Sequence, residues 1–88
     1  MNIFFINSIG ETTWGGGEKW MLMSAIGLRS RGHKVYFGGR KGSKFLSVCS
    51  ENNFPIFELS IKGDFGLINI FKLTKYFRKN SINIIIAN

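Results

Sequence analysis

The chain is poor in the residues that build disulfides and metal centres. Its 88 residues include one cysteine, Cys49, and one histidine, His33. A single cysteine cannot form a disulfide within the chain, and no Cys/His cluster has the spacing of metal ligands. Cys49 lies among Phe45, Leu46 and Val48, which is typical of a small core residue rather than of a nucleophile. We therefore predict no metal, no cofactor and a reduced, cytoplasmic protein.

Long apolar segments are also missing. The first apolar run ends at Asn7, and Asn2 stands where a signal peptide would carry a basic residue. No window approaches the ~18 apolar residues of a membrane span. The sequence predicts neither a signal peptide nor a membrane-spanning helix.

Acidic residues are few. The chain has 5 Asp and Glu against 12 Lys and Arg, a net charge of +7. Such a surface favours anionic partners, but the basic residues are scattered and form no basic arm, so nucleic acid is not the predicted partner. Lys72, Lys75 and Lys79 share one face of an expected helix. Two interpretations stay open: a solvated face, or peripheral attachment to an acidic membrane surface.

The composition that remains is globular, with 44% hydrophobic and 15% aromatic residues, enough for one small core. Four apolar runs are predicted as strands: Asn2–Asn7, His33–Gly39, Phe54–Leu59 and Ile82–Ala87. Three segments between them are predicted as helices: Glu18–Ser30, a short helix capped by Ser43 and ended by Asn52 and Asn53, and Leu67–Lys79. The order β-α-β-α-β-α-β predicts an α/β fold, a Rossmann-like open parallel sheet.

The apolar spacing also predicts which helix faces are buried. In the first helix, a broad apolar face comprises Trp20, Met21, Leu22, Ala25, Ile26 and Leu28. Gly27 costs that helix about 1 kcal/mol relative to alanine, which suggests close packing against a neighbour. In the last helix, the expected inner face comprises Leu67, Ile70, Phe71, Thr74 and Phe77.

Three glycines, Gly15, Gly16 and Gly17, connect the first strand to the first helix. Glycine lets a ligand approach the backbone closely, and the first amides of a helix have no intrahelical partner and carry partial positive charge. Because ligands of open α/β sheets bind beyond the carboxyl ends of the strands, this loop is a candidate site for phosphate or sugar hydroxyls. A flexible connector without a ligand is the alternative that stays open.

Known phosphate-binding motifs do not fit this loop. The dinucleotide fingerprint would need its third glycine at Trp20, and the P-loop would need its lysine at Gly16. The nucleophile elbow G-x-S-x-G is absent. The sequence therefore favours neither a hydride-transfer domain, nor an ordinary ATPase or kinase, nor an α/β-hydrolase.

Four segments in register resemble the N-terminal domain of family 4 glycosyltransferases. The G-G-x-E pattern of that family matches residues 15–18, and its R/K-G-H-x-V pattern matches residues 31–35. The glycine, short helix and strand that follow resemble Gly42 to Leu59, and the fourth strand corresponds to Asn83 to Asn88. The resemblance covers essentially the whole chain. Asn88 departs from the pattern, since the family often has histidine there.

The resemblance implies a two-domain enzyme. Residues 1–88 would form part of the N-terminal, acceptor-side Rossmann-like domain, and the catalytic C-terminal domain that holds the donor would lie outside this sequence. The implied reaction transfers a sugar from a nucleotide-diphosphate sugar to a glycan or lipid-linked acceptor, as in polysaccharide biosynthesis, without a metal held by an acidic triad. The chain alone would then be inactive.

The candidate substrate-binding residues are Gly15, Gly16, Gly17, Glu18, Arg40 and Asn88. Gly16 and Gly17 would contact the ligand through their backbone, and no catalytic residue is identified. Glu18 either contacts a hydroxyl or complements the helix dipole, and Arg40 either steers phosphate or belongs to a solvated loop.

Two other functions stay open. In the first, the chain is a stand-alone anion- or nucleotide-binding α/β module that acts with a separate partner chain. In the second, it is a non-functional truncated product. Neither composition nor motif spacing separates these from the glycosyltransferase.

Overall fold

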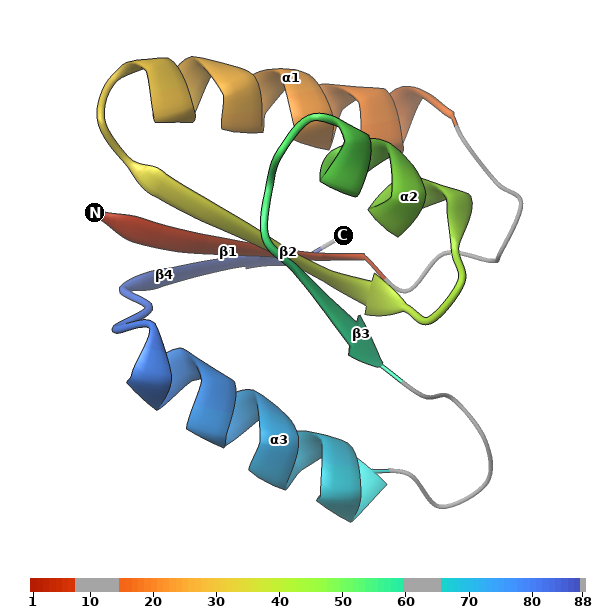
Figure 1. Ribbon diagram of the computed structural model, residues 1–88, viewed down its shortest axis with the longest axis vertical. Helices are drawn as coiled ribbons and strands as arrows, with labels where there is room; N and C mark the ends of the chain where they lie inside the picture. The colour runs from red at the N-terminus through yellow and green to blue at the C-terminus, as the bar shows by residue number, and fades with distance from the viewer. Residues whose placement is uncertain (8–14, 60–65, 88) are drawn as a thin grey trace.

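The computed structural model describes residues 1–7, 15–59 and 66–87, and the side chains of the last helix from Phe71 onward. Seven elements follow one another in the predicted alternation (Figure 1). The strands are β1 (Asn2–Asn7), β2 (Lys34–Arg40), β3 (Ile56–Leu59) and β4 (Ile84–Ala87), and the helices are α1 (Gly16–Ser30), α2 (Lys44–Glu51) and α3 (Gly66–Lys79). The predicted α/β class and element order are confirmed, with boundaries displaced by one or two residues at most strand starts.

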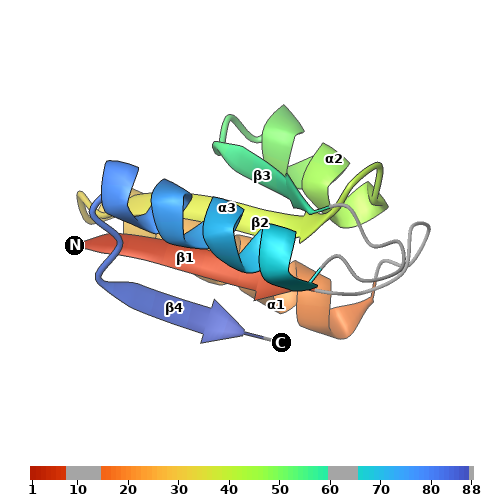
Figure 2. The same cartoon turned by 90° about the horizontal axis from the view of Figure 1, so that it is seen from below.

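The four strands form one parallel sheet in the order β3-β2-β1-β4. β1 pairs with β2 from Asn2 opposite Lys34 to Asn7 opposite Gly39. Its other edge pairs with β4, so the chain steps outward to β2 and β3 and then returns to the far side of β1 (Figure 2). This reversal makes the carboxyl ends of β1 and β4 the switch point of the sheet, where ligands bind in open α/β folds.

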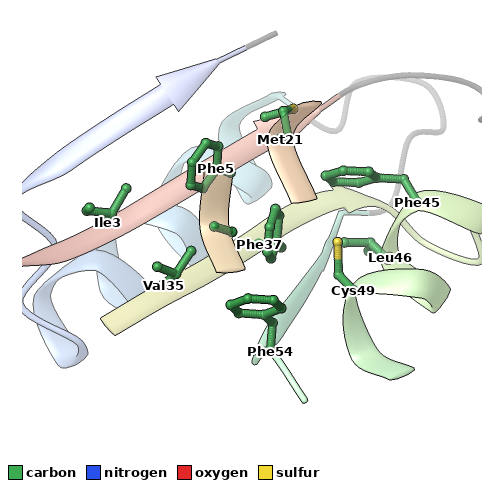
Figure 3. Close-up of a cluster of buried hydrophobic side chains, with 10 residues drawn as sticks. Ile3, Phe5, Met21, Val35, Phe37, Phe45, Leu46, Cys49 and Phe54 are labelled. Carbon is green, nitrogen blue, oxygen red and sulfur yellow. The ribbon is translucent and has the colours of Figure 1, made fainter. Parts of the chain in front are cut away.

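Both faces of the sheet are covered by helices: α1 and α2 lie on one face and α3 on the other (Figure 1). The main core lies under α1 and α2, where aromatic rings of the strands pack together (Figure 3). Phe37 sits at its centre, with ring centroids 5.3 Å from Phe5 and 5.1 Å from Phe54. The fully buried members include Phe5, Met21, Ala25, Phe37, Phe45 and Cys49. The continuous apolar runs of β1 and β2 are explained by this burial on both faces.

The buried face of α3 agrees with the expected one at Phe77 and differs from it elsewhere. The side chains of Leu67 and Ile70, also expected there, lie outside the described residues. Tyr76 and Phe77 pack on the sheet, with ring centroids 5.8 and 4.9 Å from Phe4. Phe71 is 74% exposed and Thr74 is also exposed, so their predicted inner positions are wrong. The physical reason is that Tyr76 lies among Phe4, Tyr36 and Phe57, and this aromatic contact sets the rotation of the helix.

Two glycines differ sharply in their surroundings. A Cβ on Gly38 would lie 2.4 Å from Cζ of Phe4, so β2 needs glycine where the Phe4 ring crosses it. Gly27 in α1 is exposed, and a Cβ there would meet no atom of the described residues within 4 Å. The expected close packing at Gly27 is therefore wrong.

The last strand is the least covered. Ile84 is 39% exposed and Ile85 53% exposed, while Ile86 packs against the core. The strand begins two residues later than predicted. Just before it, the Asn83 amide donates to the Asn2 carbonyl (2.8 Å) and the Asn83 side chain accepts from the Asn2 amide (2.9 Å). None of the helices that the structure describes combines the length and the apolar composition of a membrane span.

Candidate functional site

The first turn of α1 follows directly from the glycine-rich segment. Gly15 is the N-cap in an extended conformation, and α1 starts at Gly16. The three glycines are exposed, and a Cβ on Gly16 would meet nothing within 4 Å. Because Gly16 and Gly17 open the helix, their amides have no intrahelical acceptor. The chain therefore presents accessible backbone donors at the carboxyl edge of the sheet.

Glu18 is held in place by the protein. Its side chain is 3% exposed, and its two oxygens accept different hydrogen bonds. Oε1 accepts from the Gly15 amide at 2.7 Å, and Oε2 accepts from Nδ2 of Asn7 at 3.1 Å. The carboxylate thus caps the helix and ties it to the end of β1. Two roles were expected for Glu18. The structure shows its carboxylate at the helix end, bonded to the Gly15 amide, while its contact with a ligand hydroxyl stays a prediction.

Asn7 is the residue of this site that sequence reasoning missed. It is the last residue of β1, 2% exposed, and its amide also lies 3.6 Å from the Met21 sulfur. The available signal was a polar residue at the end of an otherwise apolar strand, just before a glycine-rich segment. Such a residue lies at the ligand edge of a parallel sheet.

The end of β2 lies beside Asn7. Gly39 is the register partner of Asn7, and a Cβ on Gly39 would lie 3.0 Å from the Asn7 carbonyl oxygen and 3.3 Å from Leu46. Ser43 then caps α2 by accepting from the Leu46 amide at 3.2 Å. The backbone is therefore tightly packed where β1 and β2 end.

Arg40 ends β2 at the same edge but on the other face. Side chains alternate along a strand, and Tyr36 and the Cβ position of Gly38 both lie on the α3 face, which places Arg40 there too. Its Nε is buried and has no hydrogen-bond partner among the described residues. The structure thus brings Gly15–Glu18 together with Asn7 on one face, and sets Arg40 apart from them. Asn88 lies outside the described residues.

Cys49 and His33 lie away from this edge. Cys49 is fully buried in α2, and burial raises the pKa of its thiol to about 12, so its interpretation as a core residue is confirmed. His33 precedes β2 at the opposite end of the sheet, and its buried Nδ1 has no hydrogen-bond partner in the part of the chain that the structure describes. Among the described residues, no group of three His, Cys, Asp or Glu side chains is placed to hold a metal ion.

Comparison with known proteins supplies a structural match. A crystal structure of MurG from Acinetobacter baumannii, a glycosyltransferase of the GT-B fold, matches with a TM-score of 0.77 at 14% sequence identity. The match covers 98% of this chain and 27% of the MurG chain. No protein-family model matches the chain. A sequence search of curated proteins also finds no match.

The match confirms the fold. The four-stranded parallel sheet and its helices superpose on one part of a GT-B glycosyltransferase, and this chain spans about a quarter of that protein's length. MurG belongs to glycosyltransferase family 28, so the match does not single out family 4. At 14% identity the match shows the fold alone.

Proposed function

We propose that this chain is the N-terminal part of a glycosyltransferase. In this proposal it shapes the acceptor side of a cleft, and a second domain holds a nucleotide-diphosphate sugar. The transferred sugar goes to a glycan or a lipid-linked acceptor. The observation that carries the proposal is the match of nearly the whole chain to part of MurG, with the glycine-opened helix α1 at the carboxyl edge of the sheet.

The chemistry at this edge suits a diphosphate. Diphosphate develops negative charge as it leaves, and amides at a helix N-terminus stabilise such charge. The open space at Gly16 leaves room for close approach to the backbone. We propose that the backbone amides of Gly16 and Gly17 contact the diphosphate. Glu18 and Asn7 would hold these amides in position, because both side chains are buried and share a hydrogen bond.

The finer assignments are also proposals. Membership of family 4 rests on the sequence resemblance at residues 15–18 and 31–35. Arg40 would reach phosphate only from the α3 face of the sheet, so its contact, like that of Asn88, is proposed for a ligand that extends across the strand ends. We also propose a cytoplasmic location, on the basis of the single cysteine, with peripheral contact of the face that carries Lys72, Lys75 and Lys79 to an acidic membrane surface.

A transfer assay tests the proposal. Since one half of a cleft cannot position both donor and acceptor, the 88-residue chain should give no turnover with a panel of nucleotide sugars and acceptors, above a Gly16→Trp control. The DNA that follows codon 88 supplies the second readout. A continuation that encodes a second Rossmann pattern supports the proposal, and transfer should appear when that continuation is expressed with the chain.

Two results would contradict it. Turnover by the 88-residue chain above the control would show that no second domain is needed. An unrelated gene directly downstream would favour the alternative, a stand-alone anion- or nucleotide-binding module that acts with a separate chain.

A further inference from the structure

A pocket opens at the amino end of the sheet, between β2 and the segment that leads into β3. β2 begins at Lys34, but its pairing with β3 starts only at Phe37, opposite Ile56. Among the strands that the structure describes, none therefore lies beside residues 34–36 on that side. A cavity of about 250 Å³ occupies this gap, and we call it the amino-edge pocket. Its lining includes basic and apolar residues: Arg29, His33, Lys34, Val35, Phe54 and Pro55.

Arg29 reaches this pocket from the last turn of α1 and is held in one orientation. Its Nη1 donates to the Asn52 carbonyl at 2.7 Å, and its guanidinium carbon lies 4.0 Å from the centre of the Phe54 ring. A guanidinium carries five donor hydrogens, so the bond to Asn52 leaves others for a ligand. Because two contacts already fix its plane, little side-chain freedom is lost when Arg29 binds an anion.

The backbone of β2 adds a donor to the pocket. Val35 belongs to the core under α1 and α2, so alternation along β2 puts the Lys34 side chain on the α3 face of the gap. Backbone groups alternate as well. The Lys34 amide donates to the Met1 carbonyl beside β1, and the Phe37 amide donates to the Pro55 carbonyl beside β3, both at 3.0 Å. The Val35 amide, which lies between them, therefore points into the gap.

Charge and size define the ligand. Within the part of the chain that the structure describes, no Asp or Glu lines the pocket, and Glu51, the acid closest to it along the chain, is exposed. α1 and α2 both end beside the pocket, and each helix end carries about −0.5 of a charge. Together they offset about one of the two charges of Arg29 and Lys34, which leaves a site for one negative charge. The volume lies below the roughly 300 Å³ at which pockets for drug-sized ligands begin, so the ligand is small.

We propose that the amino-edge pocket binds a small monocarboxylate with a flat apolar body, such as an aromatic acid. The carboxylate pairs with Arg29, with Lys34 and the Val35 amide beside it, and the ring lies against Pro55. A phosphate would bring additional negative charge against two helix ends, and a nucleoside diphosphate also exceeds the pocket in size. Because the pocket lies at the opposite end of the sheet from the glycines of α1, the proposal does not depend on sugar transfer.

Amide NMR of the ¹⁵N-labelled whole chain, titrated with benzoate at constant pH and ionic strength, tests the proposal. Saturable shifts should appear at His33, Lys34, Val35 and Asn53, with a dissociation constant on the order of 1 mM for so small a ligand. Benzamide has the same shape without the charge and should bind at least about tenfold more weakly. Acetate, which lacks the ring, and inorganic phosphate should also bind more weakly than benzoate.

Variants of two neighbouring arginines locate the site. Arg29→Gln should weaken benzoate binding at least about tenfold, because it removes a charge-assisted hydrogen bond. Arg29→Lys should fall between Arg29→Gln and the wild type, because lysine keeps the charge but not the planar fork. The matched control is Arg31→Gln, since Arg31 is also exposed at the end of α1 but lines a separate groove beside Trp20 and Ile86. It should leave benzoate binding unchanged.

A second variant keeps the contacts of Arg29 intact. Lys34→Gln should weaken benzoate binding about two- to fivefold, the effect of one exposed ion pair. The dispersion of the amide spectrum checks that each variant folds.

Three outcomes would overturn the proposal. Benzoate causes no saturable shift at the amino-edge pocket, or benzamide or phosphate binds as tightly as benzoate, or folded Arg29→Gln and Arg31→Gln weaken binding equally. The last outcome would show a general attraction of anions to a basic protein instead of a site.

Discussion

The side-chain amide of Asn7, at the end of β1, lies 3.1 Å from Oε2 of Glu18, in the first turn of α1. The other carboxylate oxygen of Glu18 accepts from the Gly15 amide at 2.7 Å. One buried carboxylate therefore joins the end of a central strand to the start of the helix that follows it. The position of the glycine-opened helix end depends on this contact.

Removal of the Glu18 carboxylate should destabilise the protein. Glu18→Ala leaves the Gly15 amide without its cap acceptor and takes the carboxylate acceptor away from the buried Asn7 side chain. We expect a loss of about 1–3 kcal/mol in the free energy of unfolding, measured by urea unfolding with far-UV circular dichroism.

The matched control is Glu51→Ala, since Glu51 is exposed at the end of α2. We expect a change within about 0.5 kcal/mol. Glu18→Gln should fall between the two, because glutamine keeps one oxygen acceptor but loses the charge that complements the helix dipole. If Glu18→Ala and Glu51→Ala had the same free energy of unfolding, the proposed structural role of Glu18 would be contradicted.

Two glycine substitutions should act in opposite directions. Gly38→Ala places a Cβ 2.4 Å from the ring of Phe4, which is held by Tyr76 and Phe77, so we expect a loss of about 1–3 kcal/mol from overpacking. Gly27→Ala fills open space in the middle of α1 and should stabilise the protein by about 0.5–1 kcal/mol. Thermal unfolding of both variants measures the difference, and a neutral Gly38→Ala would contradict the contact with Phe4.

Cys49 should be unreactive in the folded protein. Burial raises the pKa of its thiol from 9.0 to about 12, and the thiolate is the reactive form. We expect alkylation by iodoacetamide at pH 8 to be at least about 100-fold slower than in urea. The sign of the pH effect follows: the unfolded thiol ionises above about pH 9 while the folded one stays protonated, so stability falls as the pH rises toward 12. Equal alkylation rates with and without urea would contradict the burial of Cys49.

The exposed edge of β4 should make the isolated chain self-associate. Ile84 and Ile85 are 39% and 53% exposed, and exposed apolar surface promotes association. Light scattering should show species above the monomer mass, and Ile85→Thr should reduce them. Met23→Thr is the control, because Met23 is also apolar and is 63% exposed but lies on α1. A stable monomer that unfolds cooperatively would contradict this prediction and favour the stand-alone module.

The sequence predicted the elements well because each strand is a short apolar run between polar or glycine-containing segments. β1 and β2 are buried on both faces, and their apolar residues are therefore continuous. A half-buried strand would instead alternate apolar and polar residues. Local signals also gave α1 and its end at Ser30, although the helix starts at Gly16, two residues before the predicted Glu18. Local pattern was sufficient for these features because they depend on neighbours along the chain.

Features that depend on partners far along the chain were missed. Apolar spacing in α3 allowed an inner face through Phe71 or through Tyr76, and only the rings of Phe4, Tyr36 and Phe57 decide for Tyr76. The pairing of Asn7 with Glu18 spans eleven positions and has no periodic signature. Arg40 was predicted at the correct edge of the sheet. The face of the sheet on which its side chain lies follows from the alternation of side chains along β2, which the prediction did not consider.

Amide NMR of the ¹⁵N-labelled chain, titrated with a nucleoside diphosphate at a concentration where the chain is monomeric, tests the proposed site most directly. The account predicts progressive shifts at Gly16, Gly17 and Glu18 and at the ends of β1 and β2, and their loss in Gly16→Trp. The residues around His33 and Asn53, at the opposite end of the sheet, should not shift. Shifts confined to that opposite end, or none at all at saturating nucleotide, would contradict the proposal that the glycine-opened end of α1 binds the diphosphate.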